Sequence, residues 1–285
     1  MRIYDEVLDS INENIAMFEP ERGGVLFGPI GRDVISLFVF DSSAHTTFSS
    51  YTISREMCEL VPQIERKTKL EYKGIVHSHP ARLDSPSHGD QLSARNALNI
   101  NPHMSRFYIP IITHIVTSRD SNTNTIQLRD GKLSSYCAIK TNRDRAGVRI
   151  AHEPVAVIPI LKSLREVTEL LKSQADYKRI SMIDSAERIF LHDGAMNMAY
   201  TLNVDEYMFM ILVNEMFPEN APNLLLSANG SNTEAVPLSW SMGCDPEDEI
   251  LKGIVSATKS KRELTHSRLH STRTKRRRSI AAIFK

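Results

Sequence analysis

The sequence has little cysteine and no long apolar run. Its three cysteines, Cys58, Cys137 and Cys244, are odd in number, far apart and without a pattern, which argues against a disulfide scaffold and against a cysteine-rich zinc site. No stretch approaches the roughly 18 apolar residues of a membrane-spanning helix. Residues 1–20 contain several acidic residues and therefore do not resemble a signal peptide. We expect a protein without membrane contact that resides in the reducing cytoplasm.

The composition is that of a globular protein in which charge is unevenly distributed. Hydrophobic residues make up 41% and charged residues 24% of the 285 residues, a length that suffices for two ordinary domains. Residues 258–285 contain ten Lys or Arg and one acidic residue, so this segment carries a net charge of +9. Because the whole chain carries +1, the preceding residues carry −8. The sequence predicts a mildly acidic body that ends in a basic tail.

One stretch in the first half of the chain has the pattern of a metal site. His77 and His79 continue a strand-like run that begins at Tyr72, and residues two apart in a strand point to the same face. Seven residues separate His79 from Ser87, and Ser87 with Asp90 has the spacing of a helix start, from which Asp90 can return a carboxylate. Two histidines and a carboxylate with an open fourth position are typical of a zinc site that retains a water for hydrolysis.

A second stretch supplies a candidate base. Glu21 precedes Gly23-Gly24 and an apolar strand, and a catalytic zinc needs a base that takes the proton of the attacking water. Each fragment also has an ordinary interpretation. The two histidines can be a surface or core pair, and Ser87 with Asp90 can be a plain capping box. Glu21 can be a solvated loop charge and the two glycines a turn, so the combination of fragments, and no single one, favours a site.

Together these fragments resemble the motif of the JAMM (MPN+) zinc metalloproteases. The pattern Glu-x-Gly-Gly-x-Leu-x-Gly at residues 21–28 is more similar to the prokaryotic JAB branch of that family. The resemblance covers about the first half of the chain and includes all five functional positions at the family's spacing. It implies that His77, His79 and Asp90 bind zinc. It also implies that Glu21 acts as general acid and base, and that Ser87 hydrogen-bonds the tetrahedral oxyanion.

The family cleaves peptide or isopeptide bonds, often at the C-terminus of ubiquitin or of a ubiquitin-like protein. The resemblance therefore implies a deubiquitinase-like zinc isopeptidase or peptidase that acts on a ubiquitin-like protein or its conjugates. Prokaryotic JAB proteins often accompany ubiquitin-like conjugation or sulfur-carrier genes, some of them in antiviral (antiphage) defence. Two alternatives stay open. One is a non-catalytic MPN scaffold, although inactive MPN domains normally lack a metal position; the other is a hydrolase that processes a sulfur-carrier protein.

Periodicity and turn residues predict an α/β (α+β) arrangement for residues 1–141, in agreement with the MPN-type mixed-sheet sandwich that the resemblance implies. We expect helices at residues 2–17, after a cap at Ser54 with a kink at Pro62, and from Asp90 to Leu98. We expect strands at residues 24–29, 34–40 and 108–117, and a hairpin that joins residues 125–128 to 132–136. The charged residues 142–158 are expected to form a linker.

A second, smaller α+β domain is expected at residues 159–257. The predicted elements are a helix at 159–175, short strands at 178–183, 187–192, 199–204, 207–213 and 223–228, and a helix at 245–257. Their order and the motif Phe217-Pro218-x-x-x-Pro222 resemble the RWD/ubiquitin-conjugating-enzyme fold. Cys244 lies near the place of such an enzyme's nucleophile, but no His-Pro-Asn precedes it, which favours an unreactive thiol. The resemblance implies a binding domain that recruits a conjugation-pathway enzyme.

The basic tail, residues 258–285, contains the run Lys275-Arg276-Arg277-Arg278. A charge run of this kind is usually a solvated, disordered segment. Basic clusters also contact nucleic acid, but no aromatic residue interleaves with this one, so base stacking is unsupported. The sequence assigns the tail no defined partner.

Overall fold

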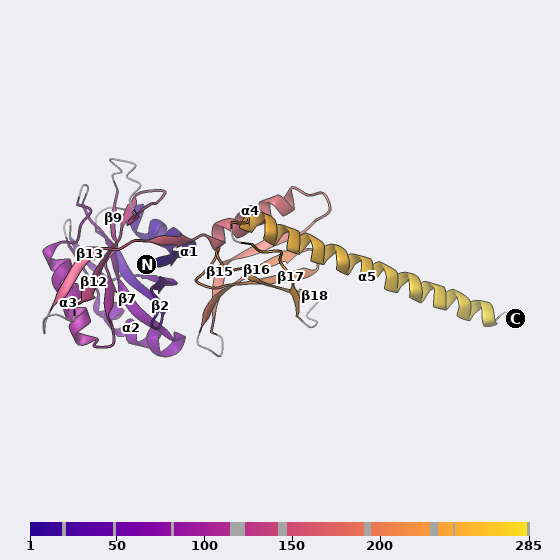
Figure 1. Ribbon diagram of the computed structural model, residues 1–285, viewed down its shortest axis with the longest axis horizontal. Helices are drawn as coiled ribbons and strands as arrows, with labels where there is room; N and C mark the ends of the chain where they lie inside the picture. The colour runs from indigo at the N-terminus through magenta and orange to yellow at the C-terminus, as the bar shows by residue number, and fades with distance from the viewer. Residues whose placement is uncertain are drawn as a thin grey trace. The chain divides into compact units, whose positions relative to one another are not determined.

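The computed structural model describes residues 1–18, 21–47, 50–80, 83–114, 123–141, 147–190, 195–228, 233–241 and 243–283. Side chains of the last helix are described as far as Leu264. The chain forms two compact units, Met1–Ile158 and Pro159–Lys285 (Figure 1). Among the helices within these ranges, none combines the length and the apolar composition needed to cross a membrane.

The N-terminal unit is built on a nine-stranded mixed sheet in which β7 (Leu70–Ser78) has an interior position. β7 pairs antiparallel with β2 (Gly23–Pro29) and parallel with β8 (Arg106–Tyr108) and β9 (Ile111–Thr113). The sheet is completed by β4 (Leu37–Phe40), β10 (Thr125–Gln127), β11 (Lys132–Ser134), β12 (Tyr136–Lys140) and β13 (Val148–His152). The β10–β11 pairing confirms the predicted hairpin, and β2 also pairs antiparallel with β4.

Two helices pack on this sheet, α2 (Arg55–Thr68) and α3 (His88–Ile100) (Figure 1). Ser54 caps α2 as predicted, because its side chain accepts a hydrogen bond from the backbone N–H of Met57. The inner face of α3 carries Ala94 and Leu98, which are fully buried against an apolar cluster of the sheet that includes Phe107. Both helices therefore have fixed positions relative to β7, which carries the two candidate histidines.

The start of the chain differs from the single helix expected at residues 2–17. Arg2–Tyr4 is a strand, β1, which precedes α1 (Asp5–Ile11) and a π-helical turn, η1 (Asn12–Ala16). β1 lies between β3 (Val34–Ile35) and β14 (Ala156–Ile158) in a small parallel sheet. A separate two-stranded ladder joins β5 (His45–Thr47) to β6 (Ser50–Thr52). Helical periodicity in the first residues was therefore overridden by pairing with a distant segment.

The expected linker at residues 142–158 is wrong for its second half. β13 pairs antiparallel with β12 over five residue pairs, and β14 pairs with β1, so residues 148–158 belong to the N-terminal unit. Residues 142–146 of the expected linker lie outside the described residues. The strand expected at 108–117 is divided into β8 and β9, since Pro110 has no N–H to donate to a ladder. Residues 115–117 also lie outside the described part.

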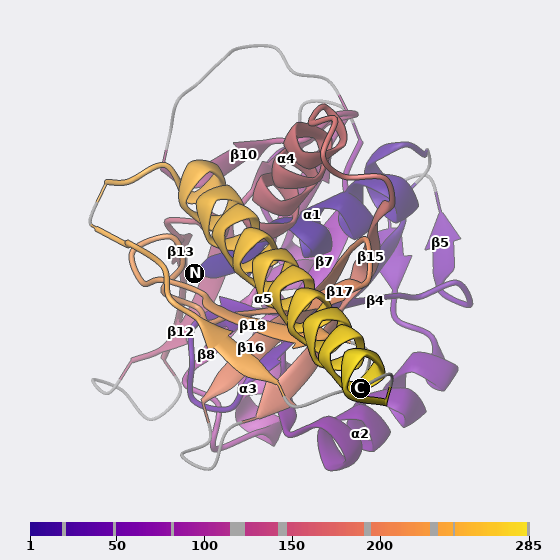
Figure 2. The ribbon, with the colours of Figure 1, turned by 90° about the vertical axis from the view of Figure 1, so that its right-hand side faces the viewer.

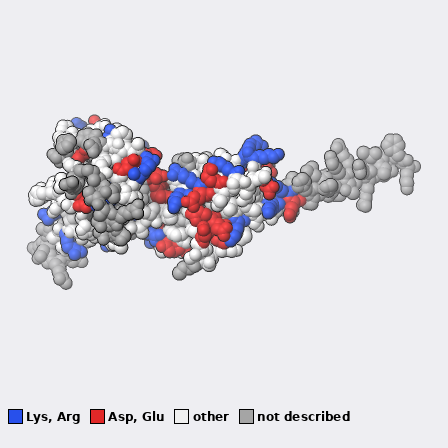
Figure 3. All heavy atoms as spheres, turned by 90° about the horizontal axis from the view of Figure 1, so that it is seen from above, with Lys and Arg blue, Asp and Glu red and all other residues white. Residues whose placement is uncertain are grey.

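The C-terminal unit is a five-stranded antiparallel meander with two helices. The strands follow in sequence order as β15 (Ile180–Phe190), β16 (Met196–Val204), β17 (Tyr207–Val213), β18 (Asn223–Ala228) and β19 (Glu234–Val236). α4 (Ile160–Lys172) and the beginning of α5 (Pro246–Ile283) lie side by side (Figures 1 and 2). Their buried residues include Leu164, Val167, Ile250 and Ile254. On the face shown in Figure 3, acidic and basic side chains are mixed over this unit.

Three features of the C-terminal unit differ from the expectations. One long strand, β15, replaces the two strands expected at 178–192, with an irregularity of register between Ile183 and Glu187. β19 was not anticipated. α5 continues without a break into the segment that was expected to be a disordered tail, although the side chains of Lys275-Arg276-Arg277-Arg278 lie outside the description. The resemblance of this unit to the RWD fold stays a prediction.

Candidate metal centre

The two candidate histidines lie at the end of β7 and face the same point. His77 is within the strand, and the backbone N–H of His79, just beyond it, donates to the carbonyl of Ile112 at 2.9 Å, so the extended pairing continues. Both imidazoles are buried, with relative exposures of 3% and 6%. Their Nε2 atoms are 2.9 Å apart. The alternation of side chains along a strand thus produces the convergence that the sequence predicted.

Asp90 approaches this point from the first turn of α3. The side-chain oxygen of Ser87 accepts a hydrogen bond from the backbone N–H of Asp90 at 3.2 Å. In return, the backbone N–H of Ser87 donates to Asp90 Oδ2 at 2.7 Å. This is a complete capping box, and it fixes the carboxylate relative to the helix. Asp90 Oδ1 lies 3.1 Å from His77 Nε2, and Oδ2 lies 3.2 Å from His79 Nε2.

The three side chains have the composition and the spacing of a metal site. Their ligand atoms all lie within 4.8 Å of one another. Ligands bound tetrahedrally to one ion at ~2.0–2.1 Å would lie about 3.3 Å from each other. The two Nε2 atoms, 2.9 Å apart, and His77 Nε2 with Asp90 Oδ1, 3.1 Å apart, are close to this separation. The group His77, His79 and Asp90 can therefore hold a metal ion without rearrangement of the backbone.

The electrostatics of the group favour a cation. Burial would raise the pKa of Asp90, but hydrogen bonds with His77 and His79 outweigh it and hold that pKa far below its usual range. Burial would lower the pKa of His79, yet hydrogen bonding to the Asp90 carboxylate raises it instead. The carboxylate is therefore ionised at neutral pH, and the space between the three side chains attracts positive charge.

The two histidines differ in what supports them. His79 Nδ1 lies 3.0 Å from the carbonyl oxygen of Leu83. Because a carbonyl can only accept, Nδ1 carries the proton and the Nε2 lone pair is left for a ligand bond. His77 Nδ1 is also buried, but no described group hydrogen-bonds to it. Tyr51 stacks on the His77 ring instead, with 5.7 Å between centroids and 18° between the planes.

Glu21 is held next to the histidines by the residue that separates them. Ser78 Oγ accepts from the backbone N–H of Arg22 at 2.9 Å, and the Ser78 N–H donates to the Arg22 carbonyl at 2.8 Å. Glu21 is 5% exposed, which excludes a solvated loop charge. Burial raises the pKa of Glu21, against the lowering effect of His79 and His77. A buried carboxyl with a raised pKa exchanges a proton more readily near neutral pH than an exposed one.

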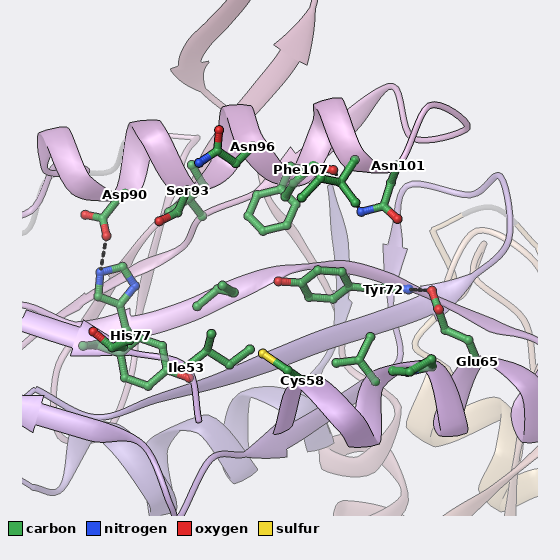
Figure 4. Close-up of a pocket in the computed structure, with 18 residues that line it drawn as sticks. Ile53, Cys58, Glu65, Tyr72, His77, Asp90, Ser93, Asn96, Asn101 and Phe107 are labelled. Atoms are coloured by element: carbon green, nitrogen blue, oxygen red, sulfur yellow. Dashed lines mark hydrogen bonds and ion pairs between the residues drawn. The ribbon is translucent and has the colours of Figure 1, made fainter. Parts of the chain in front are cut away.

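Two adjoining cavities surround the group. The smaller one, of about 310 Å³, is lined by Glu21, His77, His79, Ser87 and Asp90 among others, so the structure brings all five predicted residues to one space. The larger one, of about 610 Å³, extends from His77 between α2 and α3 (Figure 4). In Figure 4 its walls include Cys58 and Glu65 of α2, Asn96 of α3 and the aromatic rings of Tyr72 and Phe107.

Two contributors to the site were not anticipated from the sequence. The carbonyl of Leu83 orients His79, and a backbone group leaves no residue-type signal. Tyr51 lines both cavities and contacts His77, but it lies outside the motif. In the sequence, the close approach of Tyr51 to His77 is indicated by Gly23, which pairs with His77. A Cβ at Gly23 would lie 2.6 Å from the Tyr51 ring and 2.9 Å from His77 Cβ.

Comparison with known proteins agrees with the geometry. Residues 5–128, which include all five motif residues, match the family described as prokaryotic homologs of the JAB domain. A search of curated proteins finds no match. Similar solved structures include the solution structure of a Desulfitobacterium hafniense protein, 14% identical, with 56% of this chain and 94% of that chain covered and a TM-score of 0.37. They also include a JAB1/MPN domain protein from Archaeoglobus fulgidus, 19% identical, with 55% and 99% covered and a TM-score of 0.28. The N-terminal unit of this chain is a prokaryotic JAB (MPN) domain.

Proposed function

We propose that this chain is a zinc-dependent isopeptidase or peptidase that cleaves after the C-terminus of a ubiquitin-like protein. The observation that carries the proposal is that a complete group of two imidazoles and a carboxylate shares one cavity with a buried glutamate. A scaffold would not require that combination. The JAB family contains both hydrolases and non-catalytic members, and the completeness of this group supports the hydrolase.

His77, His79 and Asp90 would hold the zinc ion. Zinc in such a site supplies a Lewis acid and lowers the pKa of a coordinated water toward ~7. The three side chains leave one side of the group open to the smaller cavity, where the substrate carbonyl would lie. The Leu83 carbonyl keeps the proton of His79 on Nδ1, away from the ion.

Glu21 would move the proton during hydrolysis. Its carboxylate accepts the proton of the attacking water and then delivers it to the leaving amine. Burial raises the pKa of Glu21, which supports this role because a higher pKa makes the protonated acid more accessible at neutral pH. The pair of backbone and side-chain hydrogen bonds between Arg22 and Ser78 keeps Glu21 beside the two imidazoles.

Ser87 would stabilise the negative charge that develops on the carbonyl oxygen. Its oxygen already accepts the N–H of Asp90, and its side chain lines the smaller cavity, into which its hydroxyl would donate. A preorganised donor at this place contributes to the transition state and not to substrate binding alone.

The larger cavity would receive the segment of the substrate next to the scissile bond. It adjoins the metal group through His77, Asp90 and Tyr51, and its walls mix apolar and aromatic side chains with a few polar ones. Such a lining suits the extended C-terminal tail of a ubiquitin-like protein. The C-terminal unit would recruit a conjugation-pathway enzyme or the modified target. A sulfur-carrier protein, which also ends in an extended tail, is the alternative substrate.

The test compares wild type with Glu21→Gln and His77→Ala. Zinc content is measured by atomic absorption, and cleavage is measured on a ubiquitin-like protein fused through its C-terminus to a reporter. We expect zinc in wild type and in Glu21→Gln, and cleavage in wild type alone. Glu21→Gln is isosteric, so lost cleavage with retained zinc isolates proton transfer. His77→Ala should lose zinc.

Other outcomes contradict parts of the proposal. Full activity of Glu21→Gln would remove Glu21 from the mechanism. Zinc without cleavage of the fusion, followed by cleavage of a sulfur-carrier precursor, would replace the substrate. A wild-type protein that binds no zinc from a buffered zinc solution would support the scaffold function.

A further inference from the structure

The two metal-ligand histidines of the proposed zinc site are supported by different means. In protein metal sites, a ligating histidine almost always donates its second ring N–H to a carboxylate, a carbonyl or water, which fixes the orientation of the ring. His79 follows this rule through the Leu83 carbonyl. His77 does not, because its Nδ1 is buried and no described group or solvent reaches it. In the structure, His77 Nε2 lies 3.1 Å from Asp90 Oδ1. When Nε2 binds an ion instead, none of the described residues hydrogen-bonds the His77 ring, so another contact must fix its orientation.

The ring of Tyr51 is in the position to do so. It lies nearly parallel to the His77 imidazole, at an 18° angle and a centroid separation of 5.7 Å, an offset stacked arrangement. A rotation of the imidazole about its Cβ–Cγ bond would drive its edge into the tyrosine ring. The stack therefore limits the rotation that a hydrogen bond at Nδ1 would otherwise prevent.

The neighbouring strand is shaped to admit this ring. Gly23 pairs with His77 across β2 and β7. A Cβ at Gly23 would lie 2.6 and 2.7 Å from two atoms of the Tyr51 ring and 2.9 Å from His77 Cβ. Since real Cβ atoms do not approach so closely, any larger residue at position 23 would displace the ring from the imidazole. Glycine at this position serves the contact between Tyr51 and His77.

Tyr51 is itself fixed from its other end. Its hydroxyl donates to Asp41 Oδ2 at 3.3 Å. Asp41 is buried and accepts two further hydrogen bonds of 2.7 Å, from the backbone N–H and the hydroxyl of Ser54, the N-cap of α2. The tyrosine ring is thus tied to the start of a helix, which is a rigid support for a stack.

We propose that Tyr51 is a positioning residue of the metal centre: its ring, in place of a hydrogen bond at Nδ1, holds the His77 imidazole in the orientation that binds the ion. The inference rests on the proposed function in that an ion is taken to bind at Nε2. It assigns the role to the ring and leaves the hydroxyl a secondary one, because the hydroxyl contacts Asp41 and not His77.

The test uses Tyr51→Phe, Tyr51→Ala and a matched control, Tyr136→Ala. Tyr136 packs against His152 in the same unit, with 4.6 Å between centroids and 34° between the ring planes, and it lines neither cavity. Zinc affinity is measured by competition with a chromophoric chelator, and the geometry of the site by the absorption spectrum of the Co²⁺-substituted protein. Circular dichroism reports folding.

We expect Tyr51→Ala to weaken zinc binding by about 10–100-fold, the usual effect of removing a group that orients a ligand, and to alter the Co²⁺ spectrum. Tyr51→Phe and Tyr136→Ala should keep the wild-type affinity and spectrum. An unchanged affinity for folded Tyr51→Ala would overturn the proposal. So would an equal loss in Tyr136→Ala, which would show a general effect of destabilisation.

A crystal structure of the metal-free Tyr51→Ala protein separates this inference from the proposed function. If wild type binds no zinc, the proposed function fails, but the role of the ring is still measured by the His77 rotamer. We expect a single rotamer in wild type and in Tyr51→Phe, and a second rotamer in Tyr51→Ala. A single unchanged rotamer in all three proteins would refute the positioning role. If Tyr51→Ala does not fold, Tyr51→Leu, which keeps apolar volume without a flat ring, replaces it with the same expectation.

Discussion

Ser87 has two roles that can be separated by substitution. It caps α3, because its oxygen accepts the N–H of Asp90 at 3.2 Å. In the proposed mechanism its hydroxyl also donates to the developing oxyanion. Alanine removes both functions, asparagine retains a capping acceptor and offers an amide N–H in place of the hydroxyl, and glycine removes the side chain at little cost to a cap. The series Ser87→Ala, Ser87→Asn and Ser87→Gly therefore distinguishes the cap from the donor.

The magnitudes of the two effects differ enough to decide between them. Loss of an N-cap to alanine costs about 1 kcal/mol of unfolding free energy. In a unit of this size, Met1–Ile158, that corresponds to a decrease in Tm of about 2–4 °C. The backbone N–H of Ser87 still reaches Asp90 Oδ2 in every variant, so the carboxylate keeps that support. Loss of an oxyanion donor, by contrast, lowers kcat by about 10²–10³.

The assay is cleavage of the ubiquitin-like fusion by zinc-loaded protein, with Tm measured by differential scanning calorimetry. We expect Ser87→Ala and Ser87→Gly to lose activity by a similar large factor, whereas Tm falls clearly only in Ser87→Ala. Ser87→Asn should keep Tm and lose less activity, because its amide N–H can donate to the oxyanion. Asp245→Ala, which removes a helix cap in the other unit, provides a control for the effect of a lost cap on activity. Wild-type kcat in Ser87→Gly, which has no side-chain donor, would refute the donor role and leave Ser87 as a cap alone.

Three further predictions concern stability. In Gly74→Ala, the new Cβ would lie 2.0 Å from the carbonyl oxygen of Tyr108. The variant should therefore fail to fold its N-terminal unit or lose several kcal/mol of unfolding free energy, on the order of the largest single-mutation effects. Wild-type stability of the variant in urea would contradict this. Chelation should lower the Tm of wild type but leave that of Asp90→Ala unchanged, as calorimetry with and without zinc would show. Burial would raise the pKa of Asp205, but two backbone N–H groups and an arginine outweigh this effect and hold that pKa below its usual value. The ionised carboxylate therefore stabilises the fold at neutral pH, and this stabilisation is lost as pH falls below ~4. Asp205→Asn, which suits the φ of 55°, should therefore lower Tm at pH 7 and much less at pH ~3; an equal loss at both pH values would exclude the charge as the cause.

The parts of the fold that the sequence predicted correctly are those set by local signals. Side-chain alternation through His77 and His79 gave the direction of both imidazoles, and the Ser87–Asp90 spacing gave the capping box. The hairpin at residues 125–136 followed from an Asp-Gly turn. In each case the determinant lies within a few residues of the element, so no knowledge of the rest of the chain was needed.

The errors concern elements that depend on distant partners. Residues 148–152 look like a charged loop, yet they add a strand to the edge of the sheet because β12 offers free backbone groups there. Residues 156–158 form a strand because they pair with residues 2–4 across almost the whole unit, and residues 2–4 also pair with residues 34–35. Short strands of this kind have little intrinsic preference for their conformation, so tertiary contacts decide it. The same holds for Tyr51, whose importance follows from a neighbour in space.

The third ligand shows why the site and the helix are inseparable. Asp90 offers two oxygens: Oδ2 accepts the N–H of Ser87, while Oδ1 faces His77. A histidine at this position would bind the ion through one ring nitrogen. Its other ring nitrogen would then carry the proton and could not accept a hydrogen bond from the Ser87 N–H. A carboxylate is the side chain that satisfies a helix end and a cation together. The rigidity of the metal centre therefore derives from an ordinary element of helix capping, placed where β7 ends.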